Sequence, residues 1–255
     1  MLFSRPSIAK NSREAKKVFR RNPGEIRLRG LIDRTWGAPY TRPHISQSGA
    51  RFVEKYTELT LRQYLDELAS DKPVPGGGSV SAYVTALALG LTQMVGRISL
   101  KRKKKDETPE AERAESERKS KIEQILKVLE KARHDALPIV DQDPKIYKQV
   151  MDLWKEPEKL EAALAKSFQI QADLAFLALR ALEWNSEMAE LVSGSIKNDL
   201  IVSASLAHAG FEGAYHTAMI NVRYMKSHAH RDRAEEALTR LALRFEEEKA
   251  RKICL

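Results

Sequence analysis

The stretch Pro73-Val74-Pro75-Gly76-Gly77-Gly78-Ser79-Val80 decides how the rest of this 255-residue chain is organised. Its prolines keep the preceding backbone extended, and its three consecutive glycines allow dihedral angles and close ligand approach that a Cβ would forbid. Ser79 is expected to cap an apolar helix that runs to about Lys101. The unpaired N–H groups at that helix start would attract an anion or a carbonyl oxygen. The turn alone fits a ligand cradle and a plain tight turn between packed helices equally well.

Helical periodicity continues from Thr60 to about residue 250. Thr60 predicts a short helix that ends near Ser70, and Thr108-Pro109 predicts the start of a longer one. After Asn198, small residues recur every three or four positions, which permits close helix packing within one subunit or between two. No stretch alternates with a period of two. The sequence therefore predicts an all-α, up-and-down bundle of five to six helices over residues 58–255.

Positive charge is concentrated at the N-terminal end. Residues 1–58 carry 13 Lys and Arg against 5 Asp and Glu, a net charge of +8, whereas residues 59–255 carry 31 against 30. A nucleic-acid-binding domain normally has a basic surplus of its own, so the helical part is not expected to bind DNA or RNA. Residues 1–57 show no sustained period and are predicted to be a basic, poorly ordered extension. A nucleic-acid tether remains open for that extension alone.

The lone cysteine and the apolar runs bear on location. Cys254 can form no internal disulfide, so nothing suggests an oxidising compartment. The longest apolar runs, near 84–95 and 172–182, are shorter than the roughly 18 residues of a membrane span and contain polar residues. Residues 1–21 only faintly resemble an organellar presequence. The default expectation is a cytoplasmic protein without a membrane span.

A pair of carboxylates lies beside a helix break. Asp141 and Asp143 occur in Val140-Asp-Gln-Asp-Pro144, shortly after Pro138 interrupts the helical pattern. An Asp that precedes a Pro is a common helix start, so Asp143 could simply cap a new helix. A carboxylate could also transfer protons. The residues themselves leave both interpretations open.

Other candidate chemistry is sparse. Arg97 and the run Lys101–Lys105 form a basic cluster at the end of the apolar helix, either a solvated helix end or a site for an anionic ligand. The six histidines have no metal-ligand spacing, so no metal site is expected. Cys254 has no candidate base beside it in the sequence, and the glycine turn matches neither nucleotide-binding fingerprint.

Several of these segments together resemble a known family. They are Thr60-Leu-Arg-Gln-Tyr-Leu-Asp-Glu-Leu-Ala69, Pro75-Gly-Gly-Gly-Ser-Val80, the run Ala86–Val95 and Lys101–Lys105. They closely resemble the start of the formiminotetrahydrofolate cyclodeaminase/methenyltetrahydrofolate cyclohydrolase family, and weaker similarity continues to about residue 225. The resemblance implies an all-helical homodimer that acts on folates. One reaction would convert 5-formiminotetrahydrofolate to 5,10-methenyltetrahydrofolate with loss of ammonia, and the other would hydrolyse the methenyl compound to 10-formyltetrahydrofolate. No cofactor beyond the tetrahydrofolate substrate is implied.

The resemblance also implies roles for individual residues. Asp143 matches the second Asp of the family's Asp-x-Asp motif, which is regarded as the catalytic proton acceptor. The glycine turn would hold the substrate against backbone N–H groups, and the basic cluster would attract its glutamate tail. The substrate-binding positions expected on this basis are Pro75, Gly76, Gly77, Gly78, Ser79, Lys101, Lys104, Asp141, Tyr147, Asp199 and Asn221.

The chain departs from the family pattern at several of its motif positions. Pro144 stands where the family usually has Ala, Ser195 and Thr217 replace two Asn residues, and Trp154-Lys155-Glu156-Pro157 replaces a Leu-Pro-Lys segment. These departures favour an alternative in which the bundle has kept its shape and lost its chemistry. That alternative is a catalytically degenerate binding or scaffold protein of the same family.

Overall fold

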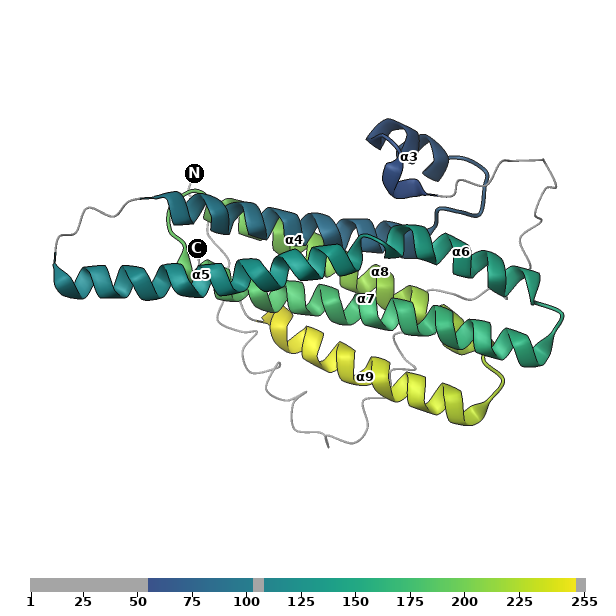
Figure 1. Cartoon of the computed structure of the whole chain (residues 1–255). Helices are drawn as coiled ribbons and strands as arrows, with labels where there is room; N and C mark the ends of the chain where they lie inside the picture. The colour runs from purple at the N-terminus through teal and green to yellow at the C-terminus, as the bar shows by residue number, and fades with distance from the viewer. Residues whose placement is uncertain (1–54, 103–107, 251–255) are drawn as a thin grey trace, which may run out of the picture. The chain divides into compact units, whose positions relative to one another are not determined.

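The protein is described by a computed structural model over residues 55–102 and 108–250 (Figure 1). In chain order the elements are the 3-10 helix η2 (Tyr56–Glu58) and the α-helices α3 (Leu61–Leu68), α4 (Gly77–Lys101), α5 (Pro109–Ala136), α6 (Ile139–Asp152), α7 (Pro157–Leu191), α8 (Lys197–Tyr224) and α9 (His228–Ala250). Within the described ranges all regular structure is helical, and α4 to α9 pack as a bundle. The predicted all-α fold is confirmed.

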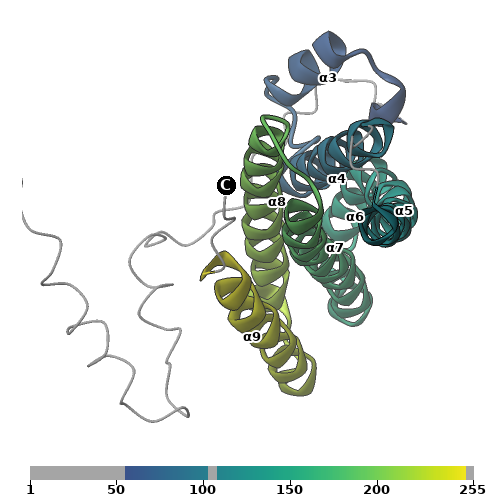
Figure 2. The ribbon, with the colours of Figure 1, turned by 90° about the vertical axis from the view of Figure 1, so that its left-hand side faces the viewer.

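Helix α7 lies at the centre of the bundle and contacts each of its other helices (Figure 2). Its sequence is rich in Ala and Leu on most faces, as expected for a helix that is buried on several sides. Leu174 and Leu179 are completely buried, as is the polar residue Gln171. A central apolar helix thus also carries a buried amide, and that amide faces the site described below.

Helices α4 and α8 pack closely because small residues line their contact. A Cβ added to Gly210 would lie 2.3 Å from Thr85 Oγ1, and one added to Gly213 would lie 2.2 Å from Ser81 Oγ. Real Cβ atoms do not approach other atoms so closely, so a side chain at either position would force Thr85 or Ser81 to move. The small residues predicted after Asn198 therefore serve helix packing within one subunit.

Helix α3 is a short amphipathic helix beside the start of α4. Thr60 and Gln63 form a capping box at its start, which confirms the predicted cap. Leu61 and Leu65 are 66% and 59% exposed, whereas Tyr64 is buried and its ring contacts the rings of Tyr56 and Tyr83. An aromatic cluster therefore attaches α3, and two of its leucines remain at the surface.

The predicted Ser79 cap is wrong, and the structure excludes Asp143 as the cap of its own helix, which is one of the two interpretations that the sequence leaves open. Helix α4 begins at Gly77 with Gly76 as its N-cap, so Ser79 lies inside the first turn and does not cap it. Helix α6 begins at Ile139, and Pro144 is accommodated inside it, so Asp143 does not cap this helix. In both cases a residue from another helix satisfies the backbone group concerned. Asp143 of α6 accepts from the Ser79 N–H in the first turn of α4, and the Ser79 hydroxyl donates to the Val140 carbonyl oxygen of α6.

Helix α4 is long and apolar enough, by length and composition alone, to cross a membrane. It is the one such helix among the described residues, and 61% of its most apolar 18-residue window is buried in the bundle. The same composition occurs in the core helices of soluble proteins. Membrane crossing is therefore not indicated.

The predicted N-terminal extension lies mostly outside the described residues. Its described part, residues 55–57, packs onto the bundle: Tyr56 is 3% exposed, and Thr57 bonds to Asp141 of α6. A large buried side chain contributes several kcal/mol, roughly 3–5 for an aromatic one. The folded bundle therefore includes Tyr56 and Thr57, which the sequence assigns to the extension.

Candidate active site

Ser79 joins the first turn of α4 to α6 through two hydrogen bonds. Its backbone N–H donates to Asp143 Oδ2 at 3.1 Å, and its Oγ donates to the carbonyl oxygen of Val140 at 2.9 Å. The Ser79 Oγ also lies 3.3 Å from the hydroxyl of Tyr64. Since the serine proton is given to Val140, the tyrosine is the donor in that contact. The side chain of Ser79 is completely buried.

The bond from Ser79 to Val140 explains how α6 accommodates Pro144. In a regular helix the carbonyl of residue 140 would accept from the N–H of residue 144, but proline has no N–H. The hydroxyl of Ser79 supplies the missing donor. Pro144 therefore leaves Asp143 directed at α4, and the departure from the family pattern does not remove the carboxylate from the glycine turn.

The second oxygen of Asp143 is bound by α7. Gln171 Nε2 donates to Asp143 Oδ1 at 2.8 Å. The two side chains lie against Gly78, where an added Cβ would be 2.3 Å from both Asp143 Oδ1 and Gln171 Nε2. The glycine turn thus permits a close approach, as predicted, but in this structure it is the protein's own carboxylate that approaches. Asp143 occupies the helix start in the manner of a capping residue from another helix.

Opposing effects act on the protonation of Asp143. Burial disfavours the charged carboxylate and raises its pKa from 3.8 to about 6, against the lowering effect of the hydrogen bonds from Ser79 and Gln171. The positive end of the α4 dipole also favours the anion. A carboxyl group with a pKa near 6 is mainly ionised at neutral pH yet accessible as an acid, which suits general acid/base chemistry.

The neighbouring carboxylate, Asp141, binds the chain rather than facing the glycine turn. Its Oδ2 accepts from Thr57 Oγ1 at 2.6 Å, and its Oδ1 accepts from the Thr57 backbone N–H at 3.1 Å. Asp141 therefore anchors η2 to α6. The two carboxylates of the Asp-x-Asp motif have separate partners, although they are two residues apart.

Helix α8 runs antiparallel to α4, so the C-terminal part of α8 lies beside the glycine turn and its first turn lies at the other end of the bundle. The predicted residues on α8 are therefore found at both ends. Thr217 lies near Gly77, since a Cβ added to that glycine would be 3.7 Å from Thr217 Oγ1. Asn221 follows one turn later, is buried, and donates to the Thr217 carbonyl. Tyr147 is one turn after Asp143 on α6. Asp199 is in the first turn of α8, some 27 Å from Thr217 at 1.5 Å per residue.

The basic cluster is likewise at the far end of α4. Lys101 is exposed at the helix end, about 33 Å along the axis from Ser79. Lys104 lies outside the described residues. Within one chain the structure therefore brings Pro75, Gly76, Gly77, Gly78, Ser79, Tyr147 and Asn221 to the region of Asp143, and leaves Lys101 and Asp199 at the opposite end.

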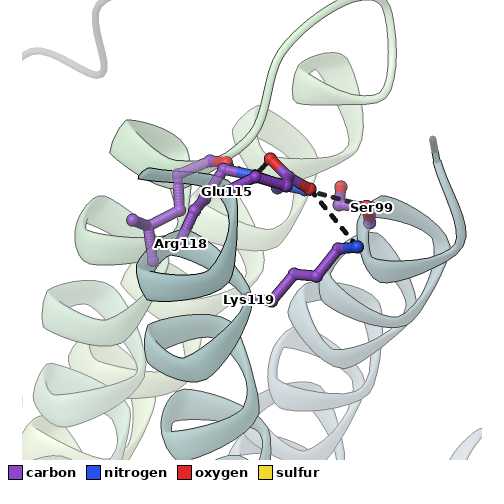
Figure 3. Close-up of polar contacts among 5 residues, drawn as sticks. Ser99, Glu115, Arg118 and Lys119 are labelled. Atoms are coloured by element: carbon purple, nitrogen blue, oxygen red, sulfur yellow. Dashed lines mark hydrogen bonds and ion pairs between the residues drawn. The ribbon is translucent and has the colours of Figure 1, made fainter. Parts of the chain in front are cut away.

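Arg118 of α5 holds that opposite end together (Figure 3). It donates to the carbonyl oxygens of Leu191 and Ser99, at 3.0 and 3.4 Å, and pairs with Glu115 at 2.6 Å. Lys119 lies 3.7 Å from the same carboxylate. These contacts connect α5 to the ends of α4 and α7. The arginine is engaged by the protein itself, so this cluster is structural.

A groove of about 340 Å³ lies between α5 and α7, apart from Asp143. Its lining includes Lys121, Trp184 and Glu187, and it contains no predicted site residue. Among the described residues no group of three His, Cys, Asp or Glu side chains is placed to hold a metal. The glycine turn remains the part of the described structure where predicted chemistry gathers.

Sequence reasoning missed Gln171, Tyr64 and Thr57, which contact the two carboxylates or their partner Ser79. Gln171 carried a recognisable signal, because it is a polar residue within a helix predicted to be apolar on most faces. Thr57 falls in the segment that the sequence predicts to be a poorly ordered extension. Tyr64 lies on α3, where the leucines form the recurring apolar pattern, so the sequence indicates the leucines as the buried face and not Tyr64.

The fold and the site define a helical-bundle protein with a buried carboxylate at a glycine-rich helix start. The family model described as formiminotransferase-cyclodeaminase matches residues 60–240, about 70% of the chain. The chain therefore belongs to the formiminotransferase-cyclodeaminase family.

Relatives within this family are distant. The chain is 24% identical over 195 residues to formimidoyltransferase-cyclodeaminase of Rattus norvegicus, which covers 72% of this chain and 34% of that protein. It is 25% identical over 193 residues to methenyltetrahydrofolate cyclohydrolase of Methylorubrum extorquens, covering 71% and 86%. The chain thus spans about a third of the length of the rat relative.

A solved structure shares the fold. Formiminotetrahydrofolate cyclodeaminase from Thermotoga maritima superposes with a TM-score of 0.67 at 24% identity, covering 75% of this chain and 92% of that one. The likeness extends over nearly the whole of the solved chain. The helical bundle of this chain therefore has the same fold as the Thermotoga maritima protein.

Proposed function

We propose that this protein is a folate one-carbon enzyme of the cytoplasm. It would deaminate 5-formiminotetrahydrofolate to 5,10-methenyltetrahydrofolate, hydrolyse 5,10-methenyltetrahydrofolate to 10-formyltetrahydrofolate, or do both. The observation that carries the proposal is the buried carboxyl of Asp143 at the start of α4, with its pKa raised to about 6. Family membership and the names of the relatives support the choice of a folate as substrate.

Asp143 can serve both reactions by moving one proton. In the deamination, N10 would attack the carbon of the protonated formimino group, C=NH2+, whose nitrogen becomes an –NH2 group, and N10 would lose its proton to the Asp143 carboxylate. The protonated Asp143 would then give a proton to the departing nitrogen, the carbon–nitrogen bond would break, and ammonia would leave. In the hydrolysis, the carboxylate would take a proton from the water that attacks the methenyl carbon. The protonated Asp143 would then give this proton to N5 as the bond between N5 and that carbon breaks, while the new hydroxyl group loses its proton to solvent and becomes the formyl carbonyl. Neither route requires a metal or a further cofactor.

The test is an absorbance assay of the purified protein on each substrate. Turnover of either folate supports the proposal. Failure to turn over either one, at enzyme concentrations where a folate demonstrably binds, would contradict it. The measurement separates binding from chemistry, which family membership alone does not.

One observation favours the non-catalytic alternative. Both oxygens of Asp143 already accept hydrogen bonds, from Ser79 and Gln171, so the carboxylate has a structural role at the start of α4. In a degenerate binding or scaffold protein that role would suffice. Folate binding without turnover is the result this alternative expects.

We further propose that the protein is a homodimer that associates through α4. One face of this helix is apolar along its whole length and remains accessible on the described chain. Leu87 is 45% exposed, and Met94 and Ile98 are each 38% exposed. The face comprises Val80, Val84, Leu87, Leu91, Met94 and Ile98. A contiguous apolar surface of this kind is typical of a protein–protein interface.

Such a dimer would also account for the basic cluster. If two α4 helices pack about a two-fold axis that crosses them, they run antiparallel, and the end of one lies toward the start of the other. Lys101 of the partner subunit would then lie toward the glycine turn of this chain. The basic cluster could in this way attract the substrate's glutamate from across the interface.

The dimer proposal predicts that Leu87→Glu combined with Met94→Glu yields a monomer, because two charges would be buried in an apolar contact. Sedimentation measures the result directly. Leu243→Glu is the matched control, since Leu243 of α9 is 53% exposed on a different helix. The proposal is wrong if the double variant sediments like the parent, or if the control dissociates equally.

A further inference from the structure

Gln171 contacts the proposed catalytic carboxyl from a completely buried position. It is 0% exposed, and its Nε2 lies 2.8 Å from Asp143 Oδ1. Gly78 lets the two side chains meet, because any Cβ there would lie 2.3 Å from both polar atoms. This contact is therefore a built feature in which three helices participate: α4, α6 and α7.

The other end of the same amide has no partner. Gln171 Oε1 is buried and accepts no hydrogen bond. Buried polar atoms are satisfied in the great majority of cases, because a buried acceptor without a donor loses the hydrogen bonds that it would make in water. An acceptor left open next to a carboxyl group has an evident use. Gln171 Oε1 can accept a hydrogen bond from the O–H of a protonated carboxyl group, whereas Nε2 can only donate one.

We propose that Gln171 is a positioning residue that gives Asp143 a hydrogen-bond partner in both of its protonation states. When Asp143 is ionised, Nε2–H donates to its Oδ1. When Asp143 holds the proton, the terminal amide turns by half a rotation and Oε1 accepts from the carboxylic O–H. The transferred proton passes between substrate and Asp143, and Gln171 never takes it. The inference rests on the proposed function, in which Asp143 is the group that moves the proton.

The surroundings determine the direction of the expected pKa change. Tyr64 of α3 is the ionisable group that interacts with both carboxylates, whereas Tyr56 of η2 interacts with Asp141 and not with Asp143. Helices α4 and α7 contribute Ser79 and Gln171, which do not ionise. A charge-assisted hydrogen bond to the anion is stronger than a neutral one to the acid, so Gln171 on balance lowers the pKa of Asp143.

The first test uses the parent protein, so it does not depend on a buried substitution. With ¹⁵N-labelled glutamine, the side-chain amide signal of Gln171 should change with a midpoint near pH 6, and this change should be absent in Asp143→Asn. The signal is assigned by its loss in Gln171→Met. A Gln171 signal that does not respond between pH 5 and 7 would overturn the proposal. The readout requires no substrate, so it can fail or succeed independently of folate turnover.

The second test compares two variants of Gln171. Methionine has similar volume and no hydrogen bond, and glutamate adds a second carboxyl that opposes ionisation of Asp143. The Asp143 carboxyl carbon should titrate at the lowest pH in the parent, about one unit higher in Gln171→Met and higher still in Gln171→Glu. In Gln171→Met kcat should fall about tenfold or more with little change in KM. A fall in kcat with the titration unmoved would leave Gln171 a packing residue only.

Discussion

Replacing Asp143 by Asn is expected to lower folate turnover by about 10²–10⁴-fold, because the substitution removes the proton acceptor and keeps the shape of the side chain. The Asn oxygen can accept from the Ser79 N–H, as Asp143 Oδ2 does now at 3.1 Å. Its amide nitrogen can donate to Gln171 Oε1, which has no partner in the parent. The contacts at the start of α4 would therefore survive the loss of the reacting group.

The same variant should separate stability from activity through its pH dependence. The folded-state pKa of Asp143 is raised from 3.8 to about 6, so folding favours the protonated form. The associated stability is fully present below about pH 4 and is lost as the pH rises through 6. A pKa difference of about two between the folded and the unfolded protein corresponds to at most roughly 3 kcal/mol of unfolding free energy. Asp143→Asn should thus unfold at a higher temperature than the parent at pH 8 and at a similar temperature at pH 4.

Asp141→Asn is the internal control for this experiment. Asp141 holds Thr57 rather than the start of α4, so its substitution should cost stability of about 1 kcal/mol and retain most turnover. Thermal unfolding and steady-state rates measure both effects. If Asp143→Asn keeps turnover within about threefold of the parent, Asp143 is a structural cap, and the non-catalytic alternative gains its main support.

Replacing Gly78 by Ala should lower both stability and folate turnover. The added Cβ would lie 2.3 Å from Asp143 Oδ1 and from Gln171 Nε2, and 2.6 Å from Asp143 Cγ. Either the carboxyl group or the start of α4 must move. Forced overpacking of this kind costs about 1–3 kcal/mol or more, and displacement of the reacting group by about 1 Å can cost about 10² in rate.

Gly77→Ala provides the matched control for the steric effect. Gly77 is exposed, and its added Cβ would be 3.7 Å from the nearest atom, Thr217 Oγ1, which is ordinary contact. Since alanine is the better helix former, this variant should be as stable as the parent or more stable by about 0.4–1 kcal/mol. Chemical denaturation compares the two directly. Equal stability of the two variants would show that the room at Gly78 is not needed.

Much of the fold could be predicted because local signals and the helical period agree. Thr60 and Thr108 cap α3 and α5 as their sequences suggest, and α4 ends at Lys101. The starts of α4 and α6 could not be predicted in the same way. The carboxylate that binds the first turn of α4 and the hydroxyl that fills the gap at Pro144 both come from distant parts of the chain.

The site was predictable at its centre and not at its edges. The sequence indicates Asp143 and the glycine turn separately, and their contact follows from the packing of α4 on α6. The distance of Lys101 from the glycine turn could have been predicted, because a continuous helix from that turn to Lys101 places the lysine about 33 Å from Ser79 within one chain. Gln171 could be identified as an unusual buried polar residue, but its orientation toward Asp143 depends on how α7 is rotated in the bundle.

The bond between the Ser79 N–H and Asp143 has a consequence for hydrogen exchange. Amides in the first turn of a helix have no partner within it and normally exchange quickly with solvent. Here the protection of the Ser79 amide depends on the docking of two helices whose bonded residues are 64 positions apart in the chain. Its exchange rate therefore reports the cooperative opening of the bundle at this point, and not the fraying of α4 alone.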